Sequence, residues 1–139
     1  MLAALCLDDR DGLSFNHRRL SRDRAQQEDL LSLARGGRLW IAPCSAALFA
    51  WAEGPVTVSE ELLDLAGPGD LCFLEDRLPD PGALEGLILY RWNRNYPADV
   101  HFHPALEDFV LTERLEFPGV SHEVITRETY LRKELHHDV

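Results

Sequence analysis

Short apolar runs recur along the chain, and each is bounded by residues that favour turns. Residues 2–7 form the first run, which stops at Asp8-Asp9. A continuous apolar run of this length is typical of a central strand that is covered on both faces. The same pattern predicts strands in four later segments, which are 39–42, 56–58, 71–74 and 87–92.

Segments between these runs have the apolar spacing and the boundary residues of helices. The longest spans 22–35, with Ser21 as its expected N-cap and the pair Gly36-Gly37 at its end. Shorter helices are predicted at 46–52 and 59–65.

The C-terminal part of the chain has a different pattern. Segments 109–117 and 129–135 alternate apolar and polar residues and are joined across Pro118-Gly119, which predicts antiparallel strands. Strands that alternate with helices and then end in a hairpin indicate an α/β fold. We therefore expect a mixed, mainly parallel central sheet with flanking helices and a C-terminal antiparallel hairpin.

Length and composition fit one domain over residues 1–139, with 45% hydrophobic and 27% charged residues. The net charge of −10 disfavours nucleic acid and anionic membrane partners, because their phosphates repel such a surface. No apolar run is long enough to cross a bilayer. The first run lacks the basic flank and the cleavage site of a signal peptide, so we interpret it as a strand.

The three cysteines, Cys6, Cys44 and Cys72, are far apart and form no CxxC pair. Each lies in or beside an apolar run, so we interpret them as reduced core residues. This cysteine usage leads us to expect a cytoplasmic protein.

A cationic cluster stands out in this acidic chain, formed by Asn16-His17-Arg18-Arg19 together with Arg22 and Arg24. Arg22 and Arg24 fall in the first turn of the predicted helix, where the helix dipole disfavours cations. An anionic ligand or an acidic partner would suit these arginines, because guanidinium groups bind carboxylates and phosphates bidentately. Pairing with carboxylates of the chain itself explains them equally well, and both interpretations stay open.

A polar and aromatic run that includes Trp92, Arg94 and Asp99 leaves the predicted strand 87–92. Loops at strand ends often carry binding residues, so these three are candidate ligand contacts, although Arg94 and Asp99 are also suited to clamping the loop. Asp99 also alternates with His101 and His103, but a single His-x-His is a weak signal, and we predict no metal site.

Ser121 and His122 are neighbours near the end of the chain. Members of a catalytic triad must meet in space, whereas adjacent side chains on an extended segment point apart. We interpret this pair as part of a turn that leads into the last strand.

The order of elements and several short phrases resemble dihydrofolate reductase. The collinear segments are 2–9, 20–23, 59–74, 87–103 and 121–132. The resemblance implies the fold of that family and places Asp23 in the pterin pocket, where a buried carboxyl with a raised pKa would relay a proton. Tyr90 aligns with the threonine that hydrogen-bonds this acid, so Asp23 and Tyr90 are the candidate catalytic residues. Without the resemblance, Asp23 is better explained as an aspartate that stabilises its own helix.

The chain departs from that family where the family holds its cofactor. A glycine pair and a helix that bind the pyrophosphate are replaced here by Glu75-Asp76. The arginine expected after strand 39–42 is missing from segment 42–45, and the loop that contacts the 2′-phosphate is absent between Gly54 and Val56. We therefore expect no cofactor.

Three functions remain open. The first is a binding module for a small anionic or heterocyclic ligand, without NADPH-dependent reduction. The alternatives are an active pterin or folate reductase that holds NADPH by an altered site, and an acidic factor that binds a basic protein partner. The deleted loop would leave strand 56–58 at the edge of the sheet, so we also expect a homodimer.

Overall fold

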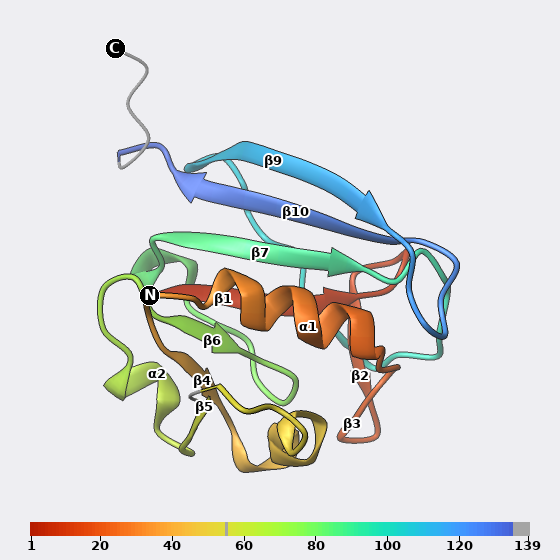
Figure 1. Ribbon diagram of the computed structural model, residues 1–139. Coiled ribbons are helices and arrows are strands. Elements are labelled where there is room, and N and C mark those ends of the chain that lie inside the picture. Colours follow the sequence, from red (N-terminus) through yellow and green to blue (C-terminus); the bar gives the residue numbers. More distant parts are fainter. Residues whose placement is uncertain (55, 135–139) are drawn as a thin grey trace.

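The computed structural model describes residues 1–54 and 56–134. Within these residues, seven strands form one sheet in the order β5-β4-β6-β1-β7-β10-β9 (Figure 1). The central strand β1 (Leu2–Leu7) pairs in parallel with β6 (Leu71–Phe73) and with β7 (Gly86–Arg91). The parallel part continues through β4 (Leu39–Ile41) to β5 (Val56–Val58), which lies at the edge as expected.

The antiparallel part of the sheet is the predicted C-terminal hairpin. Strand β10 (Ile125–Arg132) pairs antiparallel with β7 and with β9 (Phe109–Phe117). Strand β10 begins at Ile125, four residues earlier than the predicted segment 129–135. The last residue of that segment lies outside the described residues. The start of β10 is set by pairing, since Thr126 faces Arg91 of β7. The mixed, mainly parallel sheet with a C-terminal hairpin is confirmed.

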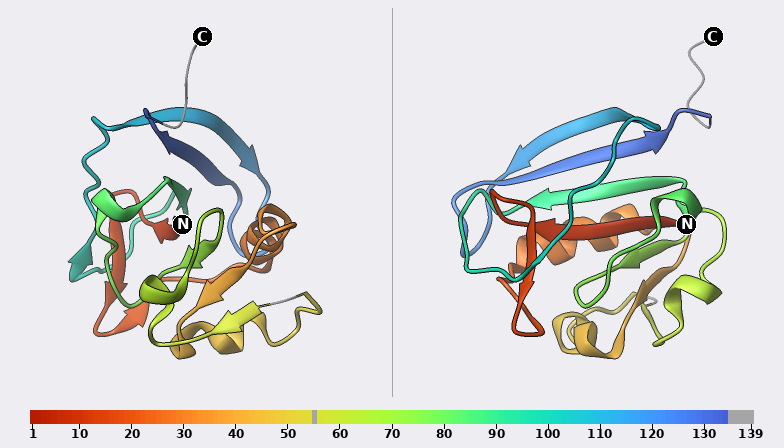
Figure 2. Two further views of the ribbon diagram at one scale, coloured as in Figure 1. Left: turned by 90° about the vertical axis from the view of Figure 1, so that its left-hand side faces the viewer. Right: turned by 180° about the vertical axis from the view of Figure 1, so that it is seen from behind.

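Apolar side chains form a core on each face of the sheet. Along β1 they alternate, so that Ala3 and Leu5 lie on one face and Ala4 and Cys6 on the other. The helix α1 (Arg24–Leu33) and the 3-10 helix η1 (Pro43–Phe49) pack on the second face (Figure 2). The first face is covered by the short helix α2 (Leu62–Leu65) and by residues next to the 3-10 helix η2 (Pro81–Ala83).

Helix α1 begins two residues later than predicted, because Asp23 caps it in place of Ser21. Asp23 has an extended backbone (φ −154°, ψ 128°), and its carboxylate accepts a hydrogen bond from the Ala25 N–H. The second predicted helix starts earlier, at Pro43, because proline fits the first position of a helix.

A small second sheet was not predicted from the sequence. It consists of β2 (Gly12–Phe15), β3 (Arg18–Arg19) and β8 (Val100–His101). The two residues between β2 and β3, Asn16 and His17, both have positive φ values (50° and 62°), as a two-residue hairpin turn requires.

The buried carboxylate of Asp8 fixes this sheet against the end of β1. It accepts hydrogen bonds from the backbone N–H groups of Arg10 (2.9 Å), Gly12 (2.7 Å) and Tyr96 (3.0 Å). Loop 93–99 is thereby held beside the turn between β1 and β2, which places two distant parts of the sequence at one end of the sheet.

Two further expectations have structural outcomes. Cys6 and Cys72 are buried, but Cys44 is exposed, so the interpretation of all three as core residues was wrong for Cys44. No helix among the described residues is long and apolar enough to cross a membrane.

Candidate functional site

Asp23 lies at the start of α1 with its side chain fully buried. Its Oδ1 accepts hydrogen bonds from the N–H groups of Ala25 (2.9 Å) and Val120 (3.0 Å). Its Oδ2 accepts from the N–H of Ser121 (2.8 Å) and lies 3.0 Å from Nδ1 of His122. Burial alone would raise the pKa of Asp23, but these hydrogen bonds hold it well below its ordinary value. Asp23 is therefore surrounded by hydrogen-bond donors, and its pKa is lowered and not raised as the resemblance implied.

His122 is buried, with only 1% of its side chain exposed, and both of its ring nitrogens have polar neighbours. On the other side of the ring from Asp23, Nε2 lies 3.1 Å from Oγ of Ser21 and 3.0 Å from the hydroxyl of Tyr96. The indole of Trp92 stacks on the imidazole, with ring centroids 4.5 Å apart and planes at 17°. The side chains of Asp23, Ser21, Tyr96 and Trp92 thus hold the ring in one orientation.

Sequence reasoning missed this cluster because it considered only the neighbours Ser121 and His122. The hydroxyl of Ser121 lies 3.2 Å from Nδ1, on the aspartate side of the ring, whereas Ser21 reaches Nε2 from 101 positions earlier. The only available signal was the resemblance, which placed segments 20–23 and 121–132 in the same fold.

Tyr90 lies away from Asp23, in a separate polar cluster beside α1. Its hydroxyl donates to Oδ2 of Asp29 (2.6 Å), which also pairs with Arg127 (2.8 Å). Arg127 in turn pairs with Glu113 across the hairpin. Burial and the negative charge of Asp29 raise the pKa of Tyr90 well above its ordinary value. This cluster joins β7, β9 and β10 to α1.

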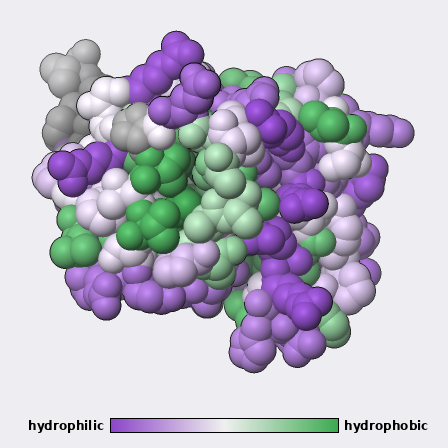
Figure 3. Space-filling view, turned by 60° about the horizontal axis from the view of Figure 1, so that its bottom comes forward, coloured by the Kyte–Doolittle hydropathy of each residue, from purple (hydrophilic) through white to green (hydrophobic). Residues whose placement is uncertain are grey.

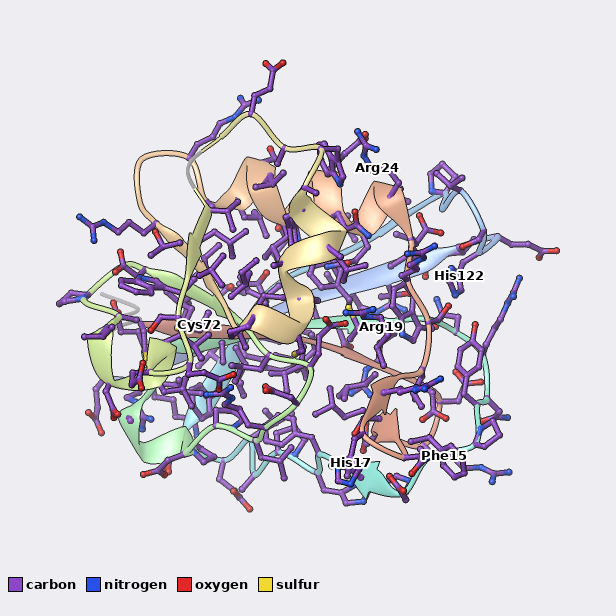
Figure 4. The ribbon with its side chains drawn as sticks, turned by 90° about the horizontal axis from the view of Figure 1, so that it is seen from below. Phe15, His17, Arg19, Arg24, Cys72 and His122 are labelled. Atoms are coloured by element: carbon purple, nitrogen blue, oxygen red, sulfur yellow. The ribbon has the colours of Figure 1, made fainter. Side chains whose placement is uncertain are left out.

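Arg19 forms an internal ion pair at the end of β6. Its Nε and Nη2 donate to the two carboxylate oxygens of Glu75 (2.7 and 3.0 Å), and Nη2 also donates to the Cys44 carbonyl (2.8 Å). The hydroxyl of Ser45 donates to the same carboxylate (2.7 Å). Figure 4 shows Arg19 near the middle of the view, whereas Phe15 and His17 of the β2–β3 hairpin lie toward its lower margin. Arg19 is therefore paired with the chain's own carboxylate.

The remaining predicted ligand contacts do not form one group. Arg18 and Arg94 are exposed, and Asn16 accompanies Asp99, whose carboxylate accepts from the Asn16 N–H (3.0 Å). Trp92 is buried against His122.

Two surface hollows adjoin these residues. The first, which we call the hairpin hollow, has a volume of about 380 Å³ and is lined by Phe15, Asn16, Arg18, Arg19, Leu20, Tyr96 and Pro97. The second hollow has a volume of about 390 Å³ and is lined by His17, Arg18, Arg19, Cys44, Glu75 and Asp76.

A further groove, of about 310 Å³, lies between α1 and η1. Arg22 and Arg24 line it, and the Arg24 guanidinium lies 3.4 Å from the ring centroid of Trp51. Arg24 also pairs with Glu28 (3.4 Å), as the intramolecular interpretation of the cationic cluster proposed. The arginines of the predicted cationic cluster therefore lie in separate parts of the surface and do not form one site. No group of three or more residues suited to a metal ion occurs among the described residues.

Comparisons with known proteins bear on the fold. No protein-family model matches the chain, and no curated protein matches its sequence. Among solved structures, it is similar to dihydrofolate reductase from Enterococcus faecalis, solved in complex with NADP(H) and RAB-propyl. The TM-score is 0.64 at 13% sequence identity, and the match covers 96% of each chain. The chain therefore has a dihydrofolate reductase-like fold.

Proposed function

We propose that this chain is a binding module for a small planar anion or anionic heterocycle and that it does not carry out NADPH-dependent reduction. The observation that carries the proposal is the ion pair between Arg19 and Glu75 at the end of β6. This ion pair supports the absence of a bound cofactor, and the hairpin hollow supports the binding of a ligand.

The surroundings of Glu75 disfavour a phosphate group. The donors that an anion would use there, from Arg19 and Ser45, already bind the Glu75 carboxylate. The next residue, Asp76, adds a second negative charge that pairs with Arg77. A dinucleotide pyrophosphate would have to displace these contacts and approach two carboxylates, so its binding is unfavourable.

The hairpin hollow has features that suit a planar anion. Its volume of about 380 Å³ lies in the range of small-molecule sites. Phe15 is 49% exposed and offers a ring face for stacking. Arg18 is exposed at the same hollow, and its side chain makes no hydrogen bond with any other described residue, so its guanidinium is available to a carboxylate or phosphate.

Folic acid is a suitable probe, because it combines a planar heterocycle with two carboxylates. We expect calorimetric titration to detect folate binding to the wild type, and Arg18→Ala to weaken it about tenfold or more. Arg35→Ala, which removes another exposed arginine beyond the end of α1, is the matched control and should bind as the wild type does. Equal binding by the wild type and Arg18→Ala, or none by the wild type, would contradict the proposed site.

NADPH tests the second half of the proposal. We expect no saturable change in nicotinamide fluorescence at micromolar NADPH. Saturable binding there would overturn the proposal and favour the reductase alternative.

A further inference from the structure

We propose that Ser21 is the nucleophile of an acyl-transfer site, with His122 as its general base and Asp23 as the residue that orients the histidine. The three side chains form a continuous hydrogen-bonded series, with 3.1 Å between Ser21 Oγ and His122 Nε2 and 3.0 Å between His122 Nδ1 and Asp23 Oδ2. This activity goes beyond ligand binding, and its three catalytic residues are not among those of the proposed ligand site.

The hydrogen bonds of Asp23 assign the proton on the imidazole. Its carboxylate accepts backbone N–H groups on both oxygens, which favours the ionised form. An ionised Asp23 accepts the Nδ1–H of a neutral His122, and the lone pair of Nε2 then faces Ser21. A Ser-His-Asp triad is defined by these geometric roles and not by sequence order.

The position of Ser21 is compatible with attack on a substrate. His122 and Asp23 are almost completely buried, whereas Ser21 is partly exposed. The preceding residue, Leu20, lines the hairpin hollow, and so does Tyr96, whose hydroxyl contacts the same Nε2. Ser21 itself lines a separate small hollow that shares Leu20 and Arg19 with the hairpin hollow. A substrate in the hairpin hollow would therefore contact Leu20 and Tyr96, which adjoin Ser21 and His122.

The substrate class follows from that hollow and rests on the proposed ligand site. Phe15 offers an apolar wall and Arg18 a partner for a carboxylate, so a small ester with an anionic end fits best. Ser21 Oγ would add to the ester carbonyl carbon as its proton passes to His122 Nε2. The leaving alkoxide takes that proton and departs as an alcohol. Water then gives a proton to His122 Nε2 and adds its oxygen to the acyl carbon. The bond from the acyl carbon to Ser21 Oγ breaks, Oγ takes the proton back from His122, and the acid is released.

The hydroxyl of Tyr96 lowers the reactivity of Ser21 by competing with it for His122. Nε2 has one lone pair, so the hydroxyls of Ser21 and Tyr96 compete for it. Tyr96→Phe removes the competitor and should make Ser21 several-fold more reactive.

A fluorophosphonate probe tests the nucleophile directly. Attack by Ser21 forms a P–O bond, breaks the P–F bond and releases HF. We expect mass spectrometry of the full chain to find one adduct, on Ser21. Ser59→Ala, which removes another partly buried serine away from His122, should label as the wild type does, and Tyr96→Phe should label faster.

No adduct on Ser21 of the folded wild-type chain, or labelling spread over unrelated serines, would overturn the proposal. His122→Gln should slow labelling about a hundredfold, as expected for loss of a general base. The wild-type result decides the matter even if that variant does not fold. Folate binding by a wild-type chain that gives no adduct on Ser21 would overturn the acyl-transfer proposal alone. An adduct on Ser21 of a chain that does not bind folate would overturn the proposed ligand site alone, so the two failures are distinguishable.

Discussion

Nδ1 of His122 lies 3.0 Å from Oδ2 of Asp23, and this contact joins the loop between β9 and β10 to the first turn of α1. The two residues are 99 positions apart. Both side chains are buried, so the contact itself is shielded from solvent. The same aspartate caps α1, so helix start and loop closure depend on one carboxylate.

Replacement of Asp23 by alanine should destabilise the fold strongly. The change removes the cap of α1 and leaves the N–H groups of Val120 and Ser121 without an acceptor. We expect a loss of about 3 kcal/mol in the free energy of unfolding, measured by urea denaturation. Asp64→Ala, at an exposed position in α2, is the control and should change it by less than about 0.5 kcal/mol.

The contribution of Asp23 should also depend on pH. Its pKa is lower in the folded chain than the value near 3.9 expected when unfolded, so the ionised form stabilises the fold. This stabilisation is present above about pH 4 and is lost as the pH falls through the folded-state pKa. The difference in unfolding free energy between the wild type and Asp23→Ala should therefore narrow below about pH 4. A difference that widens there would contradict the assignment.

Gly119 is needed for the loop to pass over Asp23. A Cβ at this position would lie 2.6 Å from Asp23 Oδ2 and 2.7 Å from the His122 carbonyl oxygen. Gly119→Ala should lower the free energy of unfolding by about 2 kcal/mol, as overpacking of a tight site does. Gly54→Ala has nothing within 4 Å of the added Cβ and should be nearly neutral. Equal effects of the two changes would argue against this loop geometry.

The neighbouring arginines Arg18 and Arg19 should differ in their effect on stability. Arg19→Ala leaves the largely buried Glu75 without its bidentate partner and should lower the free energy of unfolding by about 2 kcal/mol. Arg18 is exposed, so Arg18→Ala should change it by less than about 0.5 kcal/mol. Thermal and urea denaturation of both variants would check this, and equal stabilities would contradict the internal role of Arg19.

The edge strand β5 offers a surface for a second copy of the chain. Ser59 N–H donates to the Ile41 carbonyl, so by alternation the Thr57 N–H faces β4 and the Val58 N–H faces the open edge. Val58 is 48% exposed, and Figure 3 shows apolar side chains gathered on the left-hand part of the lower face. We expect light scattering at micromolar concentration to detect a homodimer.

Val58→Pro should separate that dimer without unfolding the protomer, because it removes an outward donor. Thr57→Pro should instead destabilise the protomer, since it removes a hydrogen bond within the sheet. A monomer mass for the wild type at all concentrations would contradict the expected dimer.

Sequence patterns predicted the main sheet because its parallel strands are continuous apolar runs and the strands of its hairpin alternate apolar and polar residues. The small second sheet was missed, since β3 and β8 have two residues each and their pairing depends on the Asp8 contacts. The boundaries of α1 were wrong by two residues because Ser21 and Asp23 are both good N-caps, and only the contacts of Asp23 with segment 120–122 decide between them.

By itself, the sequence determined the strands of the main sheet and the helices between them, the antiparallel hairpin and the acidic surface, because these depend on local spacing and composition. Only the tertiary structure decided that Arg19 binds Glu75 and that His122 lies between Asp23 and Ser21. Such contacts join residues that are 56 to 101 positions apart. Their geometry depends on how the strands pack, so no local sequence pattern predicts it.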